Sequence, residues 1–318
     1  MTRIDKPGIY DLTAAEYHAD PVSTPSLSRS IALVLCDLSP AHAEAAHPRL
    51  GPGLEDDPDE AVIAVDAKED RDAGTAAHAI FLRGENIIEQ IPFDTYQTKA
   101  AKQLRDEALA AGRIPLKQTK YADVMRMVDV LEKMRASTGF FTKGRPEQTL
   151  VWQAGDVWCR CMVDWLPDDP SAPLLDLKTT GGRARSNTWS RGAFDKGFDL
   201  QAVMYTEGAA VLREGEVASM QFIVTETRPP FGIRRFELSP DAIDIGQQRL
   251  IYSRSLWQQC MAEKHWPAYP LEPEWIDAPV FVQREWDWKL RQLPTWAARI
   301  AKREAATQRI IDAKQWGG

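Results

Sequence analysis

The sequence predicts an α/β fold in which a mixed central sheet is flanked by helices, with a helical tail at the C-terminal end. Two observations lead to this prediction. Apolar residues recur with the helical period up to about residue 140, and the period changes to two from Thr149 before helical and strand-like segments alternate. The 318 residues, 44% hydrophobic and 27% charged, are enough for a sizeable soluble core.

The first third of the chain is expected to be mainly helical. Residues 23–46 predict a helix that begins near Pro25, and residues 73–85 ("AGTAAHAIFLRGE") predict a small-residue helix that ends near Gly84. Between them, the acidic residues 54–72 are expected to form a solvated loop. Charged and apolar residues alternate with a helical period from residue 98 to residue 137.

Strands are expected from residue 149 onward. "TLVWQAGDVWCRCMVDWL" predicts a hairpin that turns at "AGD", with Cys159 and Cys161 buried on one face. "LLDLKTT" (residues 174–180) predicts a buried strand, and residues 198–215 predict an amphipathic helix. Two further strands around a Pro turn, a helix from residue 241 and a polar C-terminal helix follow.

Two domains are expected: residues 1–280, with a catalytic core at about 70–240, and a helical tail at 281–318. No apolar run reaches the roughly 18 residues of a membrane span, and the N-terminus has no secretory signal, so we expect a cytoplasmic protein. The four cysteines are too few and too scattered for a disulfide framework.

Candidate site residues gather around the strand "LLDLKTT". Asp176 and Lys178 are two residues apart in it, so both side chains project to one surface. Asp164 ends the preceding strand, and if the two strands are neighbours both carboxylates reach the same end of the sheet. His78 lies four residues after Gly74, in a helix whose small residues allow close packing.

Two carboxylates and a neutral imidazole can hold a hard divalent cation such as Mg²⁺, with Mn²⁺ as a substitute. Asp164, Asp176 and His78 would be ligands, the carbonyl of Leu177 could complete the shell, and Lys178 would act on the attacking water. The alternative for Asp176 and Lys178 is a structural ion pair at the rim of the sheet.

The set "GTAAH … VDW … LLDLKTT … QAVMY" resembles the PD-(D/E)XK nuclease superfamily, in its RecB/RecE-like branch. Three further stretches look like phage and prophage exonuclease VIII-type exodeoxyribonucleases: "YHADPVSTPSLSRSIALVLCDLSPAHAEAA", "KGFDLQAVMYTEG" and "WQQCMAEKHWPAYP". The resemblance covers most of residues 9–280.

The resemblance implies metal ligands at His78, Asp164 and Asp176, with the family's lysine at Lys178. Gln201 and Tyr205, spaced i and i+4 on one helix face, match its substrate-side motif. Glu147 matches an acid found just before the first strand; its role stays open, and a capped strand end is the alternative.

The implied activity is digestion of double-stranded DNA from an end, 5′ to 3′, by a homo-oligomer that leaves a strand for a single-strand annealing recombinase. An endonuclease or single-strand nuclease of the same fold, and a catalytically silent DNA-binding or scaffold subunit, are the alternatives. Nucleases of the RecB-like branch that carry an iron–sulfur cluster have one cysteine early in the chain and three clustered late. Here Cys36 lies early but only Cys260 lies late, so the resemblance implies no cluster.

The formal net charge of −7 argues against a general basic coat, so contact with DNA should be local. A basic segment follows the strand "LLDLKTT" and could line the DNA path, with Arg183, Arg185, Arg191 and Lys196 as the candidates. The alternative is that these are ordinary solvated loop charges.

Overall fold

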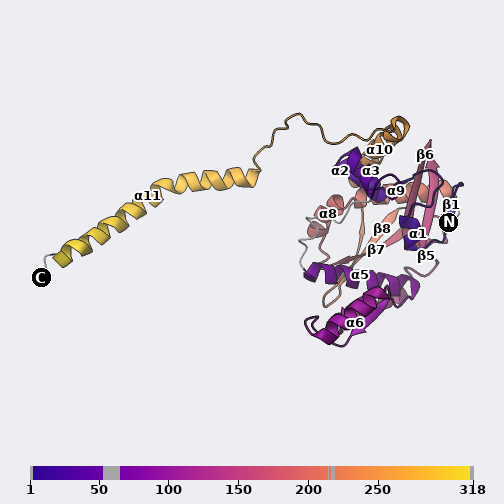
Figure 1. The fold of residues 1–318 in the computed structure, drawn as a ribbon, viewed down its shortest axis with the longest axis horizontal. Coiled ribbons are helices and arrows are strands. Elements are labelled where there is room, and N and C mark those ends of the chain that lie inside the picture. Colours follow the sequence, from indigo (N-terminus) through magenta and orange to yellow (C-terminus); the bar gives the residue numbers. More distant parts are fainter. Residues whose placement is uncertain (1–2, 53–64, 214, 216–218, 316–318) are drawn as a thin grey trace. The chain divides into compact units, whose positions relative to one another are not determined.

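The computed structural model describes residues 3–52, 65–213, 215 and 219–315. The chain divides into two compact units, Met1–Tyr269 and Pro270–Gly318. The first unit contains a mixed sheet covered by helices on both faces, and the second contains the long helix α11 (Val280–Gln315), so the predicted fold class is confirmed (Figure 1). No helix among the described residues combines the length and the apolar character that a membrane span needs.

Seven of the described strands form the sheet, in the spatial order β1-β5-β6-β7-β8-β9 with β2 added alongside β6. The β2–β6 and β7–β8 pairs are parallel and the other pairs are antiparallel. The strands are β1 (Gly8–Tyr10), β2 (Leu27–Ser28), β5 (Gly144–Ala154), β6 (Val157–Pro167), β7 (Leu174–Thr180), β8 (Met220–Glu226) and β9 (Ile233–Glu237).

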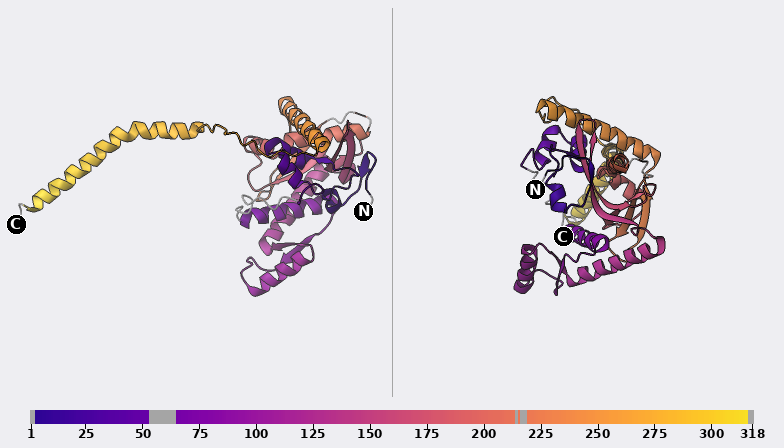
Figure 2. Two further views of the ribbon diagram at one scale, coloured as in Figure 1. Left: turned by 45° about the horizontal axis from the view of Figure 1, so that its top comes forward. Right: turned by 90° about the vertical axis from the view of Figure 1, so that its right-hand side faces the viewer.

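Helices cover both faces of this sheet (Figures 1 and 2). On one face lie α2 (Arg29–Asp37), α3 (Pro40–Ala46), α9 (Phe198–Arg213) and α10 (Pro240–Glu263). On the other lie α5 (Val65–Arg83) and α7 (Gln118–Thr138). Each layer closes its own apolar core, and β7 contributes to both: Leu174 packs in the first, and Leu175 and Leu177 pack in the second.

Smaller elements complete the first unit. The strands β3 (Ile88–Ile91) and β4 (Ile114–Lys117) form a two-stranded parallel sheet, connected through α6 (Lys99–Ala110). The short helix α1 (Ala14–His18) lies near the N-terminus, and α8 (Ser186–Asp195) lies between β7 and α9.

The hairpin, the strand "LLDLKTT" and the amphipathic helix that starts at residue 198 form as predicted, as β5–β6, β7 and α9, whereas α8 between β7 and α9 was not predicted. Cys159 and Cys161 are both fully buried in the first core. The turn of the hairpin includes Gly155, whose φ of +62° is easily adopted by glycine.

Three local predictions need correction. Residues 65–72, predicted as part of a solvated loop, are the first turns of α5. The rest of that predicted loop, residues 54–64, lies outside the described residues. The predicted helix at 98–137 is interrupted by β4, which pairs with β3. The helix predicted at residues 23–46 is divided into α2 and α3, and it begins at Arg29 and not near Pro25. Leu27 and Ser28 pair with β6, and the Ser28 side chain caps α2.

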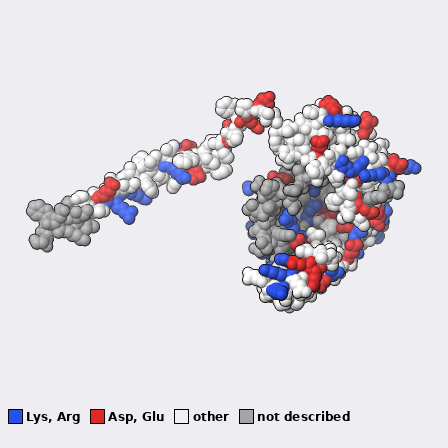
Figure 3. Space-filling model, in the orientation of Figure 1, with Lys and Arg blue, Asp and Glu red and all other residues white. Residues whose placement is uncertain are grey.

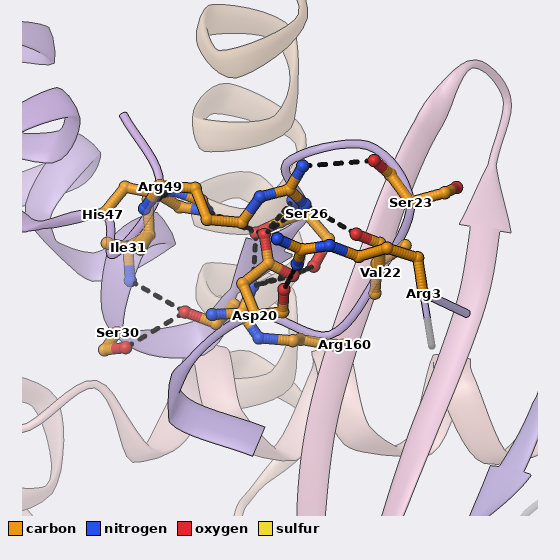
Figure 4. A network of polar contacts seen from close by, with 11 residues as sticks. Arg3, Asp20, Val22, Ser23, Ser26, Ser30, Ile31, His47, Arg49 and Arg160 are labelled. Atoms are coloured by element: carbon orange, nitrogen blue, oxygen red, sulfur yellow. Dashed lines mark hydrogen bonds and ion pairs between the residues drawn. The ribbon is translucent and has the colours of Figure 1, made fainter. Parts of the chain in front are cut away.

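A buried polar cluster around Asp20 joins the N-terminal segment to the centre of the sheet (Figure 4). Asp20 is fully buried, and its carboxylate lies 3.2 Å from Arg160 of β6 and 3.3 Å from both His47 and Arg49. It also accepts hydrogen bonds from the backbone N–H and the hydroxyl of Ser26. Burial alone would raise the pKa of Asp20, but these partners outweigh it and lower the pKa to about 2.

Candidate active site

Asp164, near the end of β6, is oriented by donors from two other elements. Its Oδ2 lies 2.8 Å from His78 Nε2 on α5, and it accepts a hydrogen bond of 2.8 Å from the backbone N–H of Leu177 on β7. The helix α5 therefore delivers His78 to the strand ends, as the sequence predicted for a small-residue helix, and the carboxylate is fixed between a helix and a strand.

The close approach of α5 to β7 depends on Gly74, one turn before His78. A Cβ at this position would collide with the Thr179 hydroxyl oxygen. A residue without a side chain lets the helix backbone lie directly against the strand, which brings His78 within hydrogen-bonding distance of Asp164.

Asp176 and Lys178 form an ion pair on β7, with 2.7 Å between Asp176 Oδ2 and Lys178 Nζ. Asp176 is fully buried, and its Oδ1 accepts a hydrogen bond of 2.5 Å from Gln201 Nε2 on α9. Lys178 Nζ also lies 5.0 Å from the centre of the Phe198 ring, a cation–π distance. Asp176 Oδ2 and Gln201 Oε1 are buried and accept no hydrogen bond from the described residues. Oδ2 is instead stabilised by the ion pair with Lys178.

The two carboxylates are held by helices that cover opposite faces of the sheet. Asp164 contacts His78 on α5, whereas Asp176 contacts Gln201 on α9. The strands β6 and β7 are antiparallel neighbours, in register at Trp165 and Leu175. Both acids thus lie where β6 and β7 pair, and the backbone N–H of Leu177 on β7 bonds to Asp164.

The charges at the site shift the pKa of each group. Burial raises the pKa of Asp176 to about 6; Lys178 opposes this shift and the negative charge of Asp164 adds to it. Burial also acts to raise the pKa of Asp164, but His78 and Lys178 outweigh it, so the pKa lies below its usual value. Burial would lower the pKa of His78, but Asp164 and Glu147 raise it to about 10. An imidazolium therefore stands among carboxylates at neutral pH.

A cavity of about 840 Å³ opens beside these residues. His78, Asp164 and Lys178 contribute to its wall from α5, β6 and β7. The remaining lining comes largely from the end of β7, the segment after it and α8, and includes Thr180, Arg183, Trp189, Lys196 and Phe198. The helix α8 is formed by part of the predicted basic segment, and Trp189 anchors it by stacking on Phe236 with 4.5 Å between ring centres.

The donor types at the site fit a hard divalent cation. They are two carboxylates, an imidazole and a main-chain carbonyl, and the buried Asp176 Oδ2 accepts no hydrogen bond from the described residues. A cation would also relieve the repulsion between Asp164 and Asp176 that raises the pKa of Asp176. As they stand, no three His, Cys, Asp or Glu side chains in the described ranges are arranged to hold an ion, since His78 bonds to Asp164 and Lys178 to Asp176.

The structure places the other predicted site residues at different depths. Gln201 is buried against Asp176, and Tyr205 is buried in the first core. Neither residue lines the cavity. Glu147 lies beside His78, with 3.3 Å between its Oε1 and His78 Nδ1.

The predicted basic residues also differ from one another. Arg183 and Lys196 line the cavity, whereas Arg185 and Arg191 are exposed and do not. Arg183 is paired with Glu226 at 2.6 Å.

Two residues at the site have no signal in the sequence that singles them out. Phe198 lies under the Lys178 ammonium group, and Arg83 donates a hydrogen bond to Glu147. Phe198 is one apolar residue among several at the start of a helix, and Arg83 is one charged residue at the end of another. Their roles depend on contacts with segments far away in the chain.

Comparison with known proteins places the chain in a family. No curated protein matches it. A crystal structure described as a "putative exonuclease" from Eubacterium rectale has the same fold, with a TM-score of 0.54 and 10% sequence identity. The similarity covers 85% of this chain and 96% of that one. The model of the family "PDDEXK-like domain of unknown function (DUF3799)" matches residues 66–278, a span that contains Asp164, Asp176, Lys178 and His78. The chain therefore belongs to this PDDEXK-like family, and through it to the PD-(D/E)XK nuclease superfamily.

Proposed function

We propose that this protein is a magnesium-dependent deoxyribonuclease that digests double-stranded DNA from an end, 5′ to 3′. The observation that carries the proposal is the meeting of Asp164, Asp176 and Lys178 on adjacent strands. Asp164 and Lys178 line one cavity together with His78, and the buried Asp176 lies behind them in an ion pair with Lys178. An ion pair with a purely structural role would need neither the second carboxylate nor the imidazole.

The residues that would hold the cation are His78, Asp164 and Asp176, with the carbonyl of Leu177. A bound Mg²⁺, or Mn²⁺ in its place, would lower the pKa of a water and polarise the phosphoryl oxygen. Gln201 fixes Asp176 through Oδ1, so that Oδ2 faces Lys178.

Lys178 is the group of this chain that acts on the reacting atoms. Asp176 and the Phe198 ring hold its ammonium group, which is about one quarter exposed at the cavity wall. From there it can orient the attacking water or stabilise the negative charge that develops on the phosphoryl oxygens.

Local contacts would hold the DNA in this proposal. Acidic and basic side chains are interspersed over the visible face of the first unit, as expected for a net charge of −7 (Figure 3). At the cavity, Arg183 and Lys196 are in position to contact phosphates, and the Glu226 carboxylate fixes the Arg183 guanidinium. Arg185 and Arg191 would contact DNA only outside the cavity.

The end-dependent, 5′-to-3′ activity is supported by the resemblance of the sequence motifs to exonuclease VIII-type proteins of the RecE-like branch. The fold shared with the described exonuclease agrees with it. We also propose a homo-oligomer that acts in the cytoplasm of a bacterial host or phage-infected cell and hands its product strand to a single-strand annealing recombinase.

The test uses linear duplex DNA labelled at either its 5′ or its 3′ end, incubated with Mg²⁺ or with a chelator. We expect progressive loss of the 5′ label with Mg²⁺, no loss with the chelator, and no cleavage of covalently closed circles. Cleavage of closed circles would instead identify an endonuclease. Binding of DNA without any cleavage would identify a silent scaffold. Light scattering on the same preparation measures the oligomeric state.

A further inference from the structure

Glu147 holds the nitrogen of His78 that faces away from Asp164. Glu147 Oε1 lies 3.3 Å from His78 Nδ1, while Nε2 of the same ring lies 2.8 Å from Asp164 Oδ2. Two carboxylates from neighbouring strands thus hold the two ring nitrogens. The proposed reaction uses the Asp164 side of the ring, and the Glu147 side has no part in it.

The backbone at Glu147 is unusual for a strand. Its φ of +45° lies in the left-handed region, although the residue is not glycine. The registered pairs Pro146–Trp165 and Gln148–Val163 lie on either side of it, so the departure is confined to this one position, opposite Asp164. Such a conformation costs on the order of 1–3 kcal/mol and persists where the surroundings fix it, often at a functional site.

A second contact fixes the rotation of the Glu147 carboxylate. Arg83 donates a hydrogen bond from Nε to Glu147 Oε2, which leaves Oε1 for His78. Arg83 and His78 both belong to α5, so the carboxylate joins two points of one helix to β5. Arg83 also lies 3.8 Å from the exposed Glu85, a second acid beside the same arginine, which offers a matched comparison.

We propose that Glu147 is the positioning residue of His78: it accepts the Nδ1 proton and thereby presents Nε2 to Asp164 and to a divalent cation. Without a cation, the imidazolium donates from Nε2 to Asp164 and from Nδ1 to Glu147. A cation that replaces the Nε2 proton would bind that nitrogen, and the remaining Nδ1 proton would stay with Glu147. The part of this inference that concerns the cation rests on the proposed function, whereas the hydrogen bond itself does not.

The hydrogen bond can be tested without metal or DNA. The histidine ring N–H signals of the full-length protein are recorded by NMR, and His78 is identified by the signal missing in His78→Gln. We expect a slowly exchanging Nδ1–H proton for His78 in the wild type and in Glu85→Leu, and loss of its protection in Glu147→Leu. Should Glu147→Leu fail to fold, Glu147→Asp decides, because the shortened carboxylate withdraws from Nδ1 and can keep its charge near Arg83.

The consequence for the site is tested by Mn²⁺ titration followed by electron paramagnetic resonance. We expect Glu147→Leu and Glu147→Asp to bind Mn²⁺ about 10- to 100-fold more weakly, as is typical when the partner of a metal-bound histidine is removed, and Glu85→Leu to match the wild type. Wild-type affinity in the Glu147 variants, an equal loss in Glu85→Leu, or an unchanged His78 ring signal would overturn the inference. A protein that cleaves no DNA but shows the expected ring signals would refute the nuclease proposal and leave the Glu147–His78 contact standing.

Discussion

Asp176 carries a buried negative charge that is needed for the reaction and does not stabilise the fold. We expect Asp176→Asn to abolish cleavage and weaken Mn²⁺ binding, because a ligand is lost. Its free energy of unfolding should stay the same or rise, because removing a buried charge removes a desolvation penalty and Lys178, about one quarter exposed, can be hydrated instead. Cleavage assays, Mn²⁺ titration and urea unfolding measure the three effects; a large loss of stability would contradict this account.

Removing the Lys178 ammonium group should slow cleavage without weakening metal binding, unlike the removal of the Asp176 carboxylate. We expect Lys178→Met to reduce the cleavage rate by about 10²- to 10³-fold, as when a group that stabilises transition-state charge is removed. The Mn²⁺ site should persist in this variant, because no ligand is lost. Lys133→Met is the control, since Lys133 is exposed on α7 and pairs with Asp129. Near-normal cleavage by Lys178→Met would show that the Asp176–Lys178 pair is structural.

Asp20, which does not line the cavity, makes the stability of the fold depend on pH. Its pKa is about 2 in the folded protein, against about 3.9 in an unfolded chain. Because the folded value is the lower one, the stabilisation is fully present above pH 4 or so and is lost as the pH falls towards about 2; a shift of this size corresponds to about 2–3 kcal/mol.

The pH dependence gives a test by substitution. Asp20→Asn should lower the free energy of unfolding at pH 7 by about 3–5 kcal/mol, since it leaves Arg160 buried without its carboxylate. The difference from the wild type should narrow between about pH 4 and pH 2. Urea unfolding at several pH values measures it, with exposed Asp169→Asn as the control. A difference that is independent of pH would rule out the assigned role of Asp20.

At the scale of elements, the packing of α5 on β7 determines whether the site is assembled. Gly74→Ala should push α5 away from Thr179 and carry His78 away from Asp164. We expect a loss of stability of about 1–3 kcal/mol, typical of an overpacked contact, and a loss of cleavage of at least about tenfold. Thermal unfolding and the cleavage assay measure the two effects.

Two variants separate the contact from a general effect of glycine replacement. Gly192→Ala, at a position on α8 where a Cβ meets nothing, should keep both stability and activity. Adding Thr179→Ala to Gly74→Ala removes the colliding hydroxyl and should restore part of the activity. If the double variant were no better than Gly74→Ala, the close approach of the two elements would not be the cause.

The whole molecule is acidic, with a formal net charge of −7, so its affinity for DNA should depend on a few phosphate contacts. We expect Lys196→Ala to lower the slope of log affinity against log salt by about one unit, because Lys196 lines the cavity. Lys133→Ala is the matched control, since Lys133 is exposed on α7 and paired with Asp129. A slope unchanged in Lys196→Ala would place the DNA elsewhere.

The sequence by itself determined the elements that carry the site. The alternation along β5 and β6, the apolar run of β7 and the amphipathic period of α9 are local properties, since backbone geometry repeats every two or about 3.6 residues. Motif spacing placed Asp164 on β6, Asp176 and Lys178 on β7, and His78 on the small-residue helix α5. Local signals did not show that β4 pairs with β3 or that α8 packs Trp189 on Phe236, because both depend on distant partners.

Only the tertiary structure decided how the site is assembled. His78 and Asp164 are 86 positions apart in the chain, and Asp164 and Asp176 are held by helices that cover opposite faces of the sheet. The left-handed backbone at Glu147, and its contacts with His78 and Arg83, have no periodic signature in the sequence. Hydrogen bonds and pKa values at the site depend on distances between segments far apart in the chain, and these distances are fixed only when the two helical layers close on the sheet.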